Sequence, residues 1–321
     1  MQVTLANWRT APFNRWAFHH VRELVPSADI ANDPARVRSL PREEMALGLE
    51  GFFQETDTDG MAVLHRGRLV FERYANGMTD ETPHILMSVS KSMLGLLVAE
   101  TGIDPERAVL DFIPELKGTA YSQATVRHLL DMRAGIVWDE DYLATSGPII
   151  EYRKATGWNP LAPGDTPTDL RSFYKKLTEA EPQGGPVHYV SPNSDLLAWV
   201  VERATGGMCA TLRDLARVGQ WLIEAMPDFL AKLGEGDAAA WASGDMAKYY
   251  PGLPMRYRSQ WYAVDGEAPL VFGMGIHGQN LFIDRANTIV IAKFSSQAAP
   301  LDAARIGLTT RAVSQLRKFL A

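Results

Sequence analysis

The sequence predicts an α/β fold: a mixed, mainly antiparallel sheet with helices on both faces and an inserted, mostly helical lobe. Three features predict it, namely β-prone hairpin patterns near both ends, mainly helical patterns between them, and a closing amphipathic helix. Strands at both ends indicate one sheet assembled from the two ends of the chain. We therefore expect a sheet domain of residues 1–115 and 245–321 and a helical domain of residues 116–244.

Two hairpins are predicted from pairs of β-prone runs around a short turn. Their strands are residues 61–65 with 68–74, and residues 280–283 with 288–294. The first turn contains Gly and the second contains Asp and Asn, which suit tight loops.

Helical patterns fill most of the remaining chain. Thr125 is a candidate N-cap for one of them, and the last has an apolar stripe at helical spacing. Prolines and glycines break the middle of the chain into loops. The expected helices cover residues 87–101, 125–132, 195–204, 211–226 and 303–320.

Composition excludes several classes of protein. With 46% apolar and 22% charged residues among 321, the chain is typical of a folded protein, and its net charge of −6 gives no reason to expect nucleic-acid binding. Cys209 is the only cysteine, so no internal disulfide forms. No secretory signal and no long apolar run is visible, so we expect a cytoplasmic protein without a membrane span.

The segment Met87–Met93, MSVSKSM, contains the sharpest candidate site. Residues three apart share a helical face, so Ser88 and Lys91 would point the same way at the start of an apolar helix. A serine hydroxyl needs a base to become a nucleophile, and a lysine whose pKa is lowered in an apolar setting can serve. The backbone N–H of Ser88 would also be free to bind an oxyanion.

A structural interpretation of the same segment stands beside the catalytic one. Ser-x-x-Lys occurs by chance in many proteins, and a serine at a helix start is usually only a cap. Ser90 and Ser92 are nucleophiles by type, but neither has a lysine three residues later, so we expect both to be structural.

Several further segments occur in one order from about Trp8 to the final helix. They are NRWAFHHVRELVP, MSVSKSMLG, TVRHLLDMRAG, DEDY, YVSPNSDLLAWVVERATG, GGMCATLRDLARVG and GMGIHGQNLF. Together they resemble the class C-like branch of the serine β-lactamase and penicillin-binding-protein superfamily, and most closely the 6-aminohexanoate-dimer hydrolases. The resemblance implies a β-lactamase-like fold and a serine hydrolase that cleaves linear amides through an acyl-enzyme. No metal or organic cofactor is implied.

The resemblance also implies roles for individual residues. Ser88 matches the nucleophile and Lys91 its activating lysine, while Tyr189 matches the tyrosine that carries the proton to the leaving group. Ser191 would help to hold this network, and Tyr142 resembles a tyrosine that contacts bound substrate. For Tyr189 a packing role, and for Tyr142 a place in a solvated acidic turn, remain the alternatives.

The segment Gly275-Ile276 matches the edge strand of the family, and the N–H of Ile276 would complete the oxyanion hole with that of Ser88. Where β-lactamases have Lys-Thr-Gly, this sequence has residues 273–279, GMGIHGQ, and the missing lysine argues against strong β-lactamase activity. His277 and Gly278 become candidate substrate contacts, with His277 recognising a carboxylate. A strand histidine packed under a loop is the alternative.

A second departure from the family lies at Gly206-Gly207, where the family places a further stretch of helix and strand. The sequence leaves open whether this stretch is deleted. Gly273-x-Gly-x-x-Gly278 fits the dinucleotide-binding pattern, but a β-prone run follows it, so we reject that interpretation. Scattered histidines argue against a catalytic zinc, and no Gly-x-Ser-x-Gly motif indicates an α/β-hydrolase.

Three functions follow from these observations. The first is an amidase, the second a short-chain carboxylesterase with the same chemistry, and the third a non-catalytic, penicillin-binding-like recognition module. The expected partner is a small-molecule amide or ester, and neither nucleic acid nor membrane is expected. A homodimer is compatible with the sequence.

Overall fold

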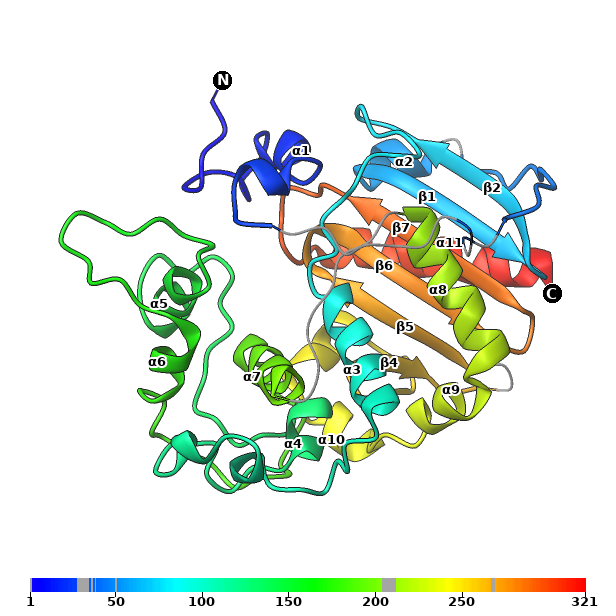
Figure 1. Cartoon of the computed structure of the whole chain (residues 1–321). Helices are drawn as coiled ribbons and strands as arrows, with labels where there is room; N and C mark the ends of the chain where they lie inside the picture. The colour runs from blue at the N-terminus through cyan, green and yellow to red at the C-terminus, as the bar shows by residue number, and fades with distance from the viewer. Residues whose placement is uncertain are drawn as a thin grey trace.

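The computed structural model describes residues 2–27, 35, 37, 39–49, 51–203, 212–266 and 269–321. Its centre is a seven-stranded sheet in the order β2-β1-β7-β6-β5-β4-β3 (Figure 1). Every neighbouring pair of these strands is antiparallel. The strands are β1 (Thr58–His65), β2 (Arg68–Tyr74), β3 (Met255–Arg258), β4 (Trp261–Val264), β5 (Leu270–Gly275), β6 (Gln279–Asp284) and β7 (Ile289–Ser295).

The sheet is assembled from the two ends of the chain, as the sequence predicts. Both expected hairpins form, β1 with β2 and β6 with β7, and β1 also pairs with β7 across the centre. The central strands are buried along nearly their whole length, so they show continuous apolar runs. Strands β3 and β4 were not predicted, because each is only four residues long and gives a weak periodic signal.

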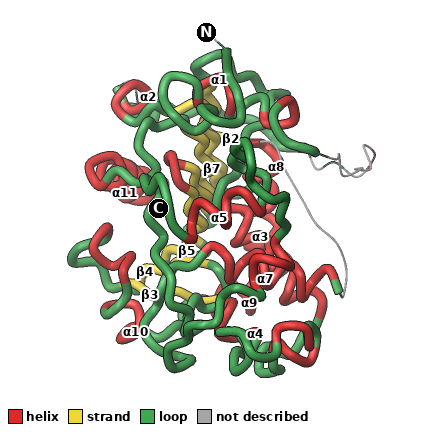
Figure 2. The backbone as a smooth tube through the Cα atoms, turned by 90° about the vertical axis from the view of Figure 1, so that its left-hand side faces the viewer, coloured by secondary structure: helices red, strands yellow, loops and turns green. Residues whose placement is uncertain are grey.

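Helices cover both faces of the sheet, as Figure 2 shows from the side. One face holds α2 (Phe52–Glu55), α10 (Ala238–Ala242) and α11 (Ala303–Leu320). The other holds α3 (Val89–Thr101), α8 (Leu212–Ala225) and α9 (Pro227–Leu233). Helices α8 and α9 fall within the expected helical domain, yet their leucines pack in one cluster with those of the sheet. The part of the chain that packs away from the sheet is therefore smaller than residues 116–244.

The helices beside the sheet share a separate apolar cluster. Thr125 caps α4 as predicted, in a capping box with His128. Helix α7 begins at Ser191, four residues before the expected start, with Pro192 in its first turn. The remaining helices are α1 (Asn14–Ala17), α4 (Val126–Leu130), α5 (Pro148–Ala155), α6 (Leu170–Tyr174) and α7 (Ser191–Glu202), with 3₁₀ turns at Val21–Glu23, Val109–Asp111, Pro114–Leu116, Asp245–Tyr249 and Ile276–Gly278.

Two of the sequence predictions concern residues 204–211, which lie outside the described residues. They are the shortened junction at Gly206-Gly207 and the environment of Cys209. In the part of the chain that the structure describes, no helix combines the length and the apolar character that crossing a bilayer requires.

Helix α3 lies unusually close to the sheet because glycines occupy the contact positions. A Cβ atom on Gly95 would lie 2.0 Å from Ser259 O, and one on Gly273 would lie 2.7 Å from Ser92 Oγ. Real Cβ atoms do not approach backbone atoms this closely, so a larger side chain would push α3 away. The sheet and the first turns of α3 are therefore held in direct backbone contact.

Gln260, in the turn between β3 and β4, joins the sheet to three helices. Its backbone O accepts a hydrogen bond from Ser92 Oγ on α3 (2.9 Å), and its Oε1 accepts one from Ser194 Oγ on α7 (2.6 Å). Its Nε2 donates to Leu129 O and Leu130 O at the end of α4 (2.8 and 2.9 Å). Gln260 is 1% exposed, so these bonds satisfy the polar groups of a fully buried side chain.

The turn between β5 and β6 contains His277 in a left-handed conformation, with φ of 61°. Its side chain is buried, and Nδ1 lies 2.7 Å from Gln297 O. Burial, opposed by the bond to Gln297 and helped by the nearby charge of Arg9, lowers the pKa of His277 to about 4. Strand β6 follows this turn, so no helix opens after Gly278, in agreement with the rejection of a dinucleotide site.

A lowered pKa of His277 predicts a loss of stability in mild acid. The unfolded chain takes up a proton below pH 6.5, whereas the folded chain resists it down to about pH 4. The contribution of His277 to the free energy of unfolding is complete above pH 6.5 and is lost as the pH falls through the folded pKa of about 4. Between about pH 7.5 and 4, the free energy of unfolding should fall by roughly 2–3 kcal/mol more in the wild type than in His277→Asn.

Chemical denaturation at a series of pH values measures this difference, with His20→Asn as the control. Asparagine tolerates the left-handed backbone, so the comparison concerns the slope and not the absolute stability. Equal slopes for the wild type and His277→Asn would contradict the prediction.

Candidate active site

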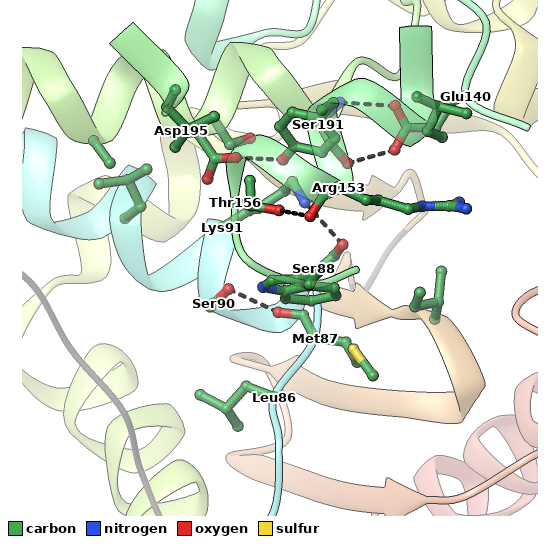
Figure 3. Close-up of a pocket in the computed structure, with 18 of the residues that line it drawn as sticks. Leu86, Met87, Ser88, Ser90, Lys91, Glu140, Arg153, Thr156, Ser191 and Asp195 are labelled. Carbon is green, nitrogen blue, oxygen red and sulfur yellow. Dashed lines mark hydrogen bonds between the residues drawn. The ribbon is translucent and has the colours of Figure 1, made fainter. Parts of the chain in front are cut away.

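Ser88 and Lys91 meet at the N-terminal end of α3. Ser88 is the residue immediately before the helix, and Lys91 is three positions later on the same face. Lys91 Nζ lies 3.0 Å from Ser88 Oγ, within hydrogen-bond distance (Figure 3). The predicted pair is therefore in contact.

Met87, the residue before Ser88, has a left-handed backbone with φ of 46°. Its side chain is buried against Trp8, Phe18 and Ile276. A residue other than glycine in this region costs on the order of 1–3 kcal/mol, and such strain persists only where packing enforces it. The strained turn brings the chain from the preceding loop into α3 and places Ser88 at the helix end.

The electrostatic setting of Lys91 differs from the expected one. Burial alone would lower the pKa of Lys91, but Tyr189 and the carboxylates of Asp195 and Glu140 outweigh it and raise that pKa. Lys91 Nζ lies 5.5 Å from the centroid of the Tyr189 ring. The prediction of a lysine with a lowered pKa in an apolar setting is therefore wrong, because two acidic residues and a phenol surround the ammonium.

Glu140 connects three parts of the site. Its carboxylate accepts hydrogen bonds from Ser191 N (3.0 Å), Ser191 Oγ (2.5 Å) and Trp138 Nε1 (2.6 Å). It thereby caps the N-terminus of α7, which has no side-chain cap of its own. Burial and Glu140 also raise the pKa of Tyr142, so this phenol is a neutral hydrogen-bond donor. Figure 3 shows Glu140 and Ser191 facing each other above Ser88.

Asp195 lies on α7, one turn after Ser191, and faces the same space. It accepts a hydrogen bond from Tyr152 OH. Burial raises the pKa of Asp195, although the charge of Lys91 opposes this effect. Sequence reasoning assigned neither Asp195 nor Glu140 to the site. Their only signal was their place in an acidic loop and at an expected helix start, and neither pattern tells which carboxylate turns inward.

The backbone around Ile276 lies directly beside Ser88. A Cβ on Gly275 would lie 2.9 Å from Ser88 N and 2.7 Å from Leu86 O, so only glycine fits here. Strand β5 is an inner strand of the sheet and not the expected edge strand. Its last three residues, however, extend beyond the part that pairs with β4 and pair only with β6. This free end lies against the N-terminus of α3.

A cavity of about 540 Å³ opens in front of Ser88. Its lining includes five of the predicted site residues: Ser88, Lys91, Tyr142, Ser191 and Ile276. Tyr189 lines a neighbouring cavity of about 500 Å³, which shares Glu140 and Tyr142 with the first. The volume of the cavity in front of Ser88, about 540 Å³, is typical of a site for a small molecule.

His277 and Gly278 do not line the cavity in front of Ser88. His277 is 2% exposed and points to Gln297 O, which agrees with the alternative of a histidine packed under a loop. Gly278 has φ of 92° and faces the Gln297 side chain. Neither residue therefore belongs to the site as the geometry defines it.

Two arginines at the cavity were not predicted. Arg9 lies against the rings of both Trp8 and Trp158 and donates to Asn159 Oδ1 at 2.6 Å. Arg153 donates to Tyr142 O at 3.2 Å. Burial and the charge of Arg153 lower the pKa of Arg9 to about 10. Neither guanidinium forms an ion pair within the described residues, so the cavity holds two like charges without a bonded carboxylate.

Comparisons with known proteins agree with this fold. The β-lactamase family profile matches residues 49–208. The 6-aminohexanoate-dimer hydrolase of Paenarthrobacter ureafaciens is 32% identical over 355 residues, covering 93% of this chain and 89% of that enzyme. The alignment is longer than this chain, so that enzyme has residues without a counterpart here.

Solved structures show the same architecture. A Bacillus anthracis protein assigned as a 6-aminohexanoate-dimer hydrolase has a TM-score of 0.86 at 24% identity, covering 99% of this chain and 97% of that one. EstCE1, a hydrolase with promiscuous acyltransferase activity, has a TM-score of 0.59 at 14% identity over 83% of this chain and 96% of that one.

The fold, the family match and the long alignment lead to one conclusion. The chain is a hydrolase that belongs to the serine β-lactamase superfamily, in the group of the 6-aminohexanoate-dimer hydrolases.

Proposed function

We propose that this chain is a serine amidase that cleaves short linear amides of the 6-aminohexanoate-oligomer type. The observation that carries the proposal is the 3.0 Å contact between Lys91 Nζ and Ser88 Oγ at the mouth of the cavity. The name of the Paenarthrobacter relative supports the substrate class. The proposed chemistry needs no metal or organic cofactor.

In the acylation step, Ser88 Oγ attacks the amide carbonyl and a C–O bond forms. Tyr189, acting as a phenolate beside the Lys91 ammonium, accepts the Ser88 proton and then donates it to the amide nitrogen as the C–N bond breaks. The charge of Lys91 stabilises negative charge on Ser88 Oγ during this transfer. The backbone N–H groups of Ser88 and Ile276 would bind the oxyanion, each worth roughly 3–4 kcal/mol.

In the deacylation step, water takes the place of the departed amine. The same pair accepts a proton from water as its oxygen attacks the acyl carbon. The bond to Ser88 Oγ then breaks and Ser88 recovers its proton, which releases the acid. Glu140 and Ser191 act as positioning residues, because they fix the start of α7 and with it the place of Tyr189.

The two arginines support a substrate with a carboxylate end. A linear aminohexanoate oligomer ends in a carboxylate, and a guanidinium binds this group with charge-assisted hydrogen bonds. Arg9 and Arg153 line the cavity together, and their mutual repulsion would be relieved by a bound anion. They take over the role that the sequence assigned to His277.

Esters are the second candidate substrates, since they have better leaving groups and the same site would accept them. The alternative of a non-catalytic recognition module is disfavoured. Such a module would not need Lys91 beside the Ser88 hydroxyl or Tyr189 close to Lys91, yet these side chains lie together.

Replacement of the nucleophile should abolish turnover. Ser88→Ala removes the hydroxyl that lies 3.0 Å from Lys91 Nζ, and we expect kcat/KM to fall by roughly three orders of magnitude or more. Hydrolysis of 6-aminohexanoate dimer and of a nitrophenyl ester measures the effect. Ser90→Ala is the matched control: within the part of the chain that the structure describes, the Ser90 hydroxyl donates only to Met87 O, so this variant should keep its activity. Undiminished turnover in Ser88→Ala would exclude this residue as the nucleophile.

Loss of the Tyr189 hydroxyl should affect amides more than esters. An amine must be protonated to leave, whereas a nitrophenolate leaves unaided, so Tyr189→Phe should lower kcat for the amide by about 10²–10⁴-fold. The loss for the nitrophenyl ester should be much smaller. Both rates are measured on one preparation, so the ester is the internal control. Equal losses on both substrates would argue against the proton-donating role.

Removal of one guanidinium should weaken the binding of carboxylate-bearing substrates. Arg9→Gln keeps a donor toward Asn159 but loses the charge, so we expect KM for the free acid to rise roughly tenfold or more. KM for the same amide with its carboxylate converted to a neutral amide should change little. Arg15→Gln, at an exposed ion pair with Asp57, is the control. An equal change in KM for both substrates would contradict carboxylate recognition.

A further inference from the structure

A second cluster of ionisable side chains lies away from the cavity in front of Ser88. His19 follows α1, Asp59 lies on β1, and His84 lies four residues before Ser88. All three are buried, and one ligand atom of each lies within 4.8 Å of the other two. His84 Nε2 is 3.2 Å and His19 Nε2 is 3.9 Å from the same oxygen, Asp59 Oδ2.

We propose that His19, Asp59 and His84 form a structural zinc site that ties the N-terminal segment to the sheet and to the segment before Ser88. Two imidazoles and one carboxylate are a common ligand set for this ion. Two ligand atoms bound tetrahedrally to one zinc ion at about 2.0–2.1 Å lie roughly 3.3 Å apart. The distances from Asp59 Oδ2 to the histidine nitrogens, 3.2 and 3.9 Å, are close to this value.

The hydrogen bonds of His84 leave one of its nitrogens directed at the carboxylate. His84 Nδ1 lies 2.9 Å from Ile85 O, a carbonyl that only accepts, so this nitrogen carries a proton. In the neutral ring Nε2 then has a lone pair, which faces Asp59 Oδ2. This contact requires either a proton or a metal cation between the two atoms.

His19 distinguishes between these two alternatives. Its Nε2 is buried and has no hydrogen-bond partner among the described residues. A protonated His84 would satisfy Asp59 but would leave His19 Nε2 without a partner. A metal ion satisfies all three atoms at once.

Neighbouring side chains hold the three proposed ligands in place, as hydrogen-bond partners of the ligands do in metal sites. Asp59 Oδ1 accepts hydrogen bonds from Asn76 Nδ2 (2.7 Å) and Ser296 Oγ (3.0 Å), which leaves Oδ2 facing the histidines. The His84 ring stacks on Phe294 and meets Phe18 edge-on. The buried ammonium of Lys293 bonds to Gly278 O and Ser295 Oγ, so it does not occupy Asp59.

The site would be structural and not catalytic. None of its three residues lines the cavity in front of Ser88. They link the N-terminal segment, strand β1 and the segment before Ser88. Phe18, next to His19, packs with Met87 and with Ile276, whose N–H is a proposed oxyanion donor. The ligands are far apart in the sequence, which explains why no zinc spacing pattern was visible there.

Metal content tests the proposal independently of turnover. The untagged full-length chain is stripped with a chelator, equilibrated with zinc, desalted and measured by elemental analysis. We expect about one zinc ion per chain in the wild type and a strong loss in His19→Gln and in His84→Gln. His20→Gln, the adjacent residue outside the cluster, should keep its zinc. Magnesium should not replace zinc, because imidazole ligands do not suit it.

A second measurement covers variants that fail to fold. Zinc should raise the melting temperature of the stripped wild type, and a chelator should reverse the shift. Cobalt bound to the wild type should show the visible absorption of a low-symmetry nitrogen and oxygen site. A folded wild type that holds no zinc and no cobalt would overturn the proposal. Full zinc retention by both folded His19→Gln and His84→Gln would also overturn it, because the ion would then be bound elsewhere.

Discussion

The close approach of α3 to β5 is the constraint on which the site depends. Gly273 and Gly275 present no side chain of the strand to the helix, so the end of β5 comes directly against the backbone at Ser88. The strained turn at Met87 then sets the direction in which α3 begins. The end of β5 and the backbone of Ser88, which are distant in the sequence, are thereby placed side by side. In the proposed mechanism, the N–H groups of Ser88 and Ile276 would need no reorganisation when charge develops on a substrate oxygen.

Side chains of both charges surround the contact between α3 and β5. Lys91 lies among Tyr189, Asp195 and Glu140, and the arginines lie further out in the same cavity. The raised pKa of Lys91 favours an ammonium at this position, as the proposed stabilisation of negative charge on Ser88 Oγ requires. Glu140 has a double function, because the carboxylate that attracts Lys91 also caps the helix that follows Tyr189. The start of α7 and the charge at Lys91 therefore depend on one side chain.

The sequence predicted what local patterns encode. Both hairpins, the bounds of α11, the cap at Thr125 and the Ser88–Lys91 contact follow from short-range spacing and are confirmed. The inward turn of Glu140 and Asp195 depends on how a loop and a helix start meet, which no local pattern records. The buried, left-handed position of His277 likewise results from packing under the 297–300 segment. The placement of α8 on the sheet was missed because its apolar face fits a sheet as well as a helix.

The bonds of Gln260 have a consequence for how the molecule can change shape. Since one buried residue bonds to α3, α4 and α7, the sheet and these helices are tied together at a single strand turn. The segment from Trp138 to Asn159 supplies Glu140, Tyr142 and Arg153 to the cavity and lies outside these bonds. Substitutions in that segment could therefore change what the cavity accepts without altering the contacts that hold α3.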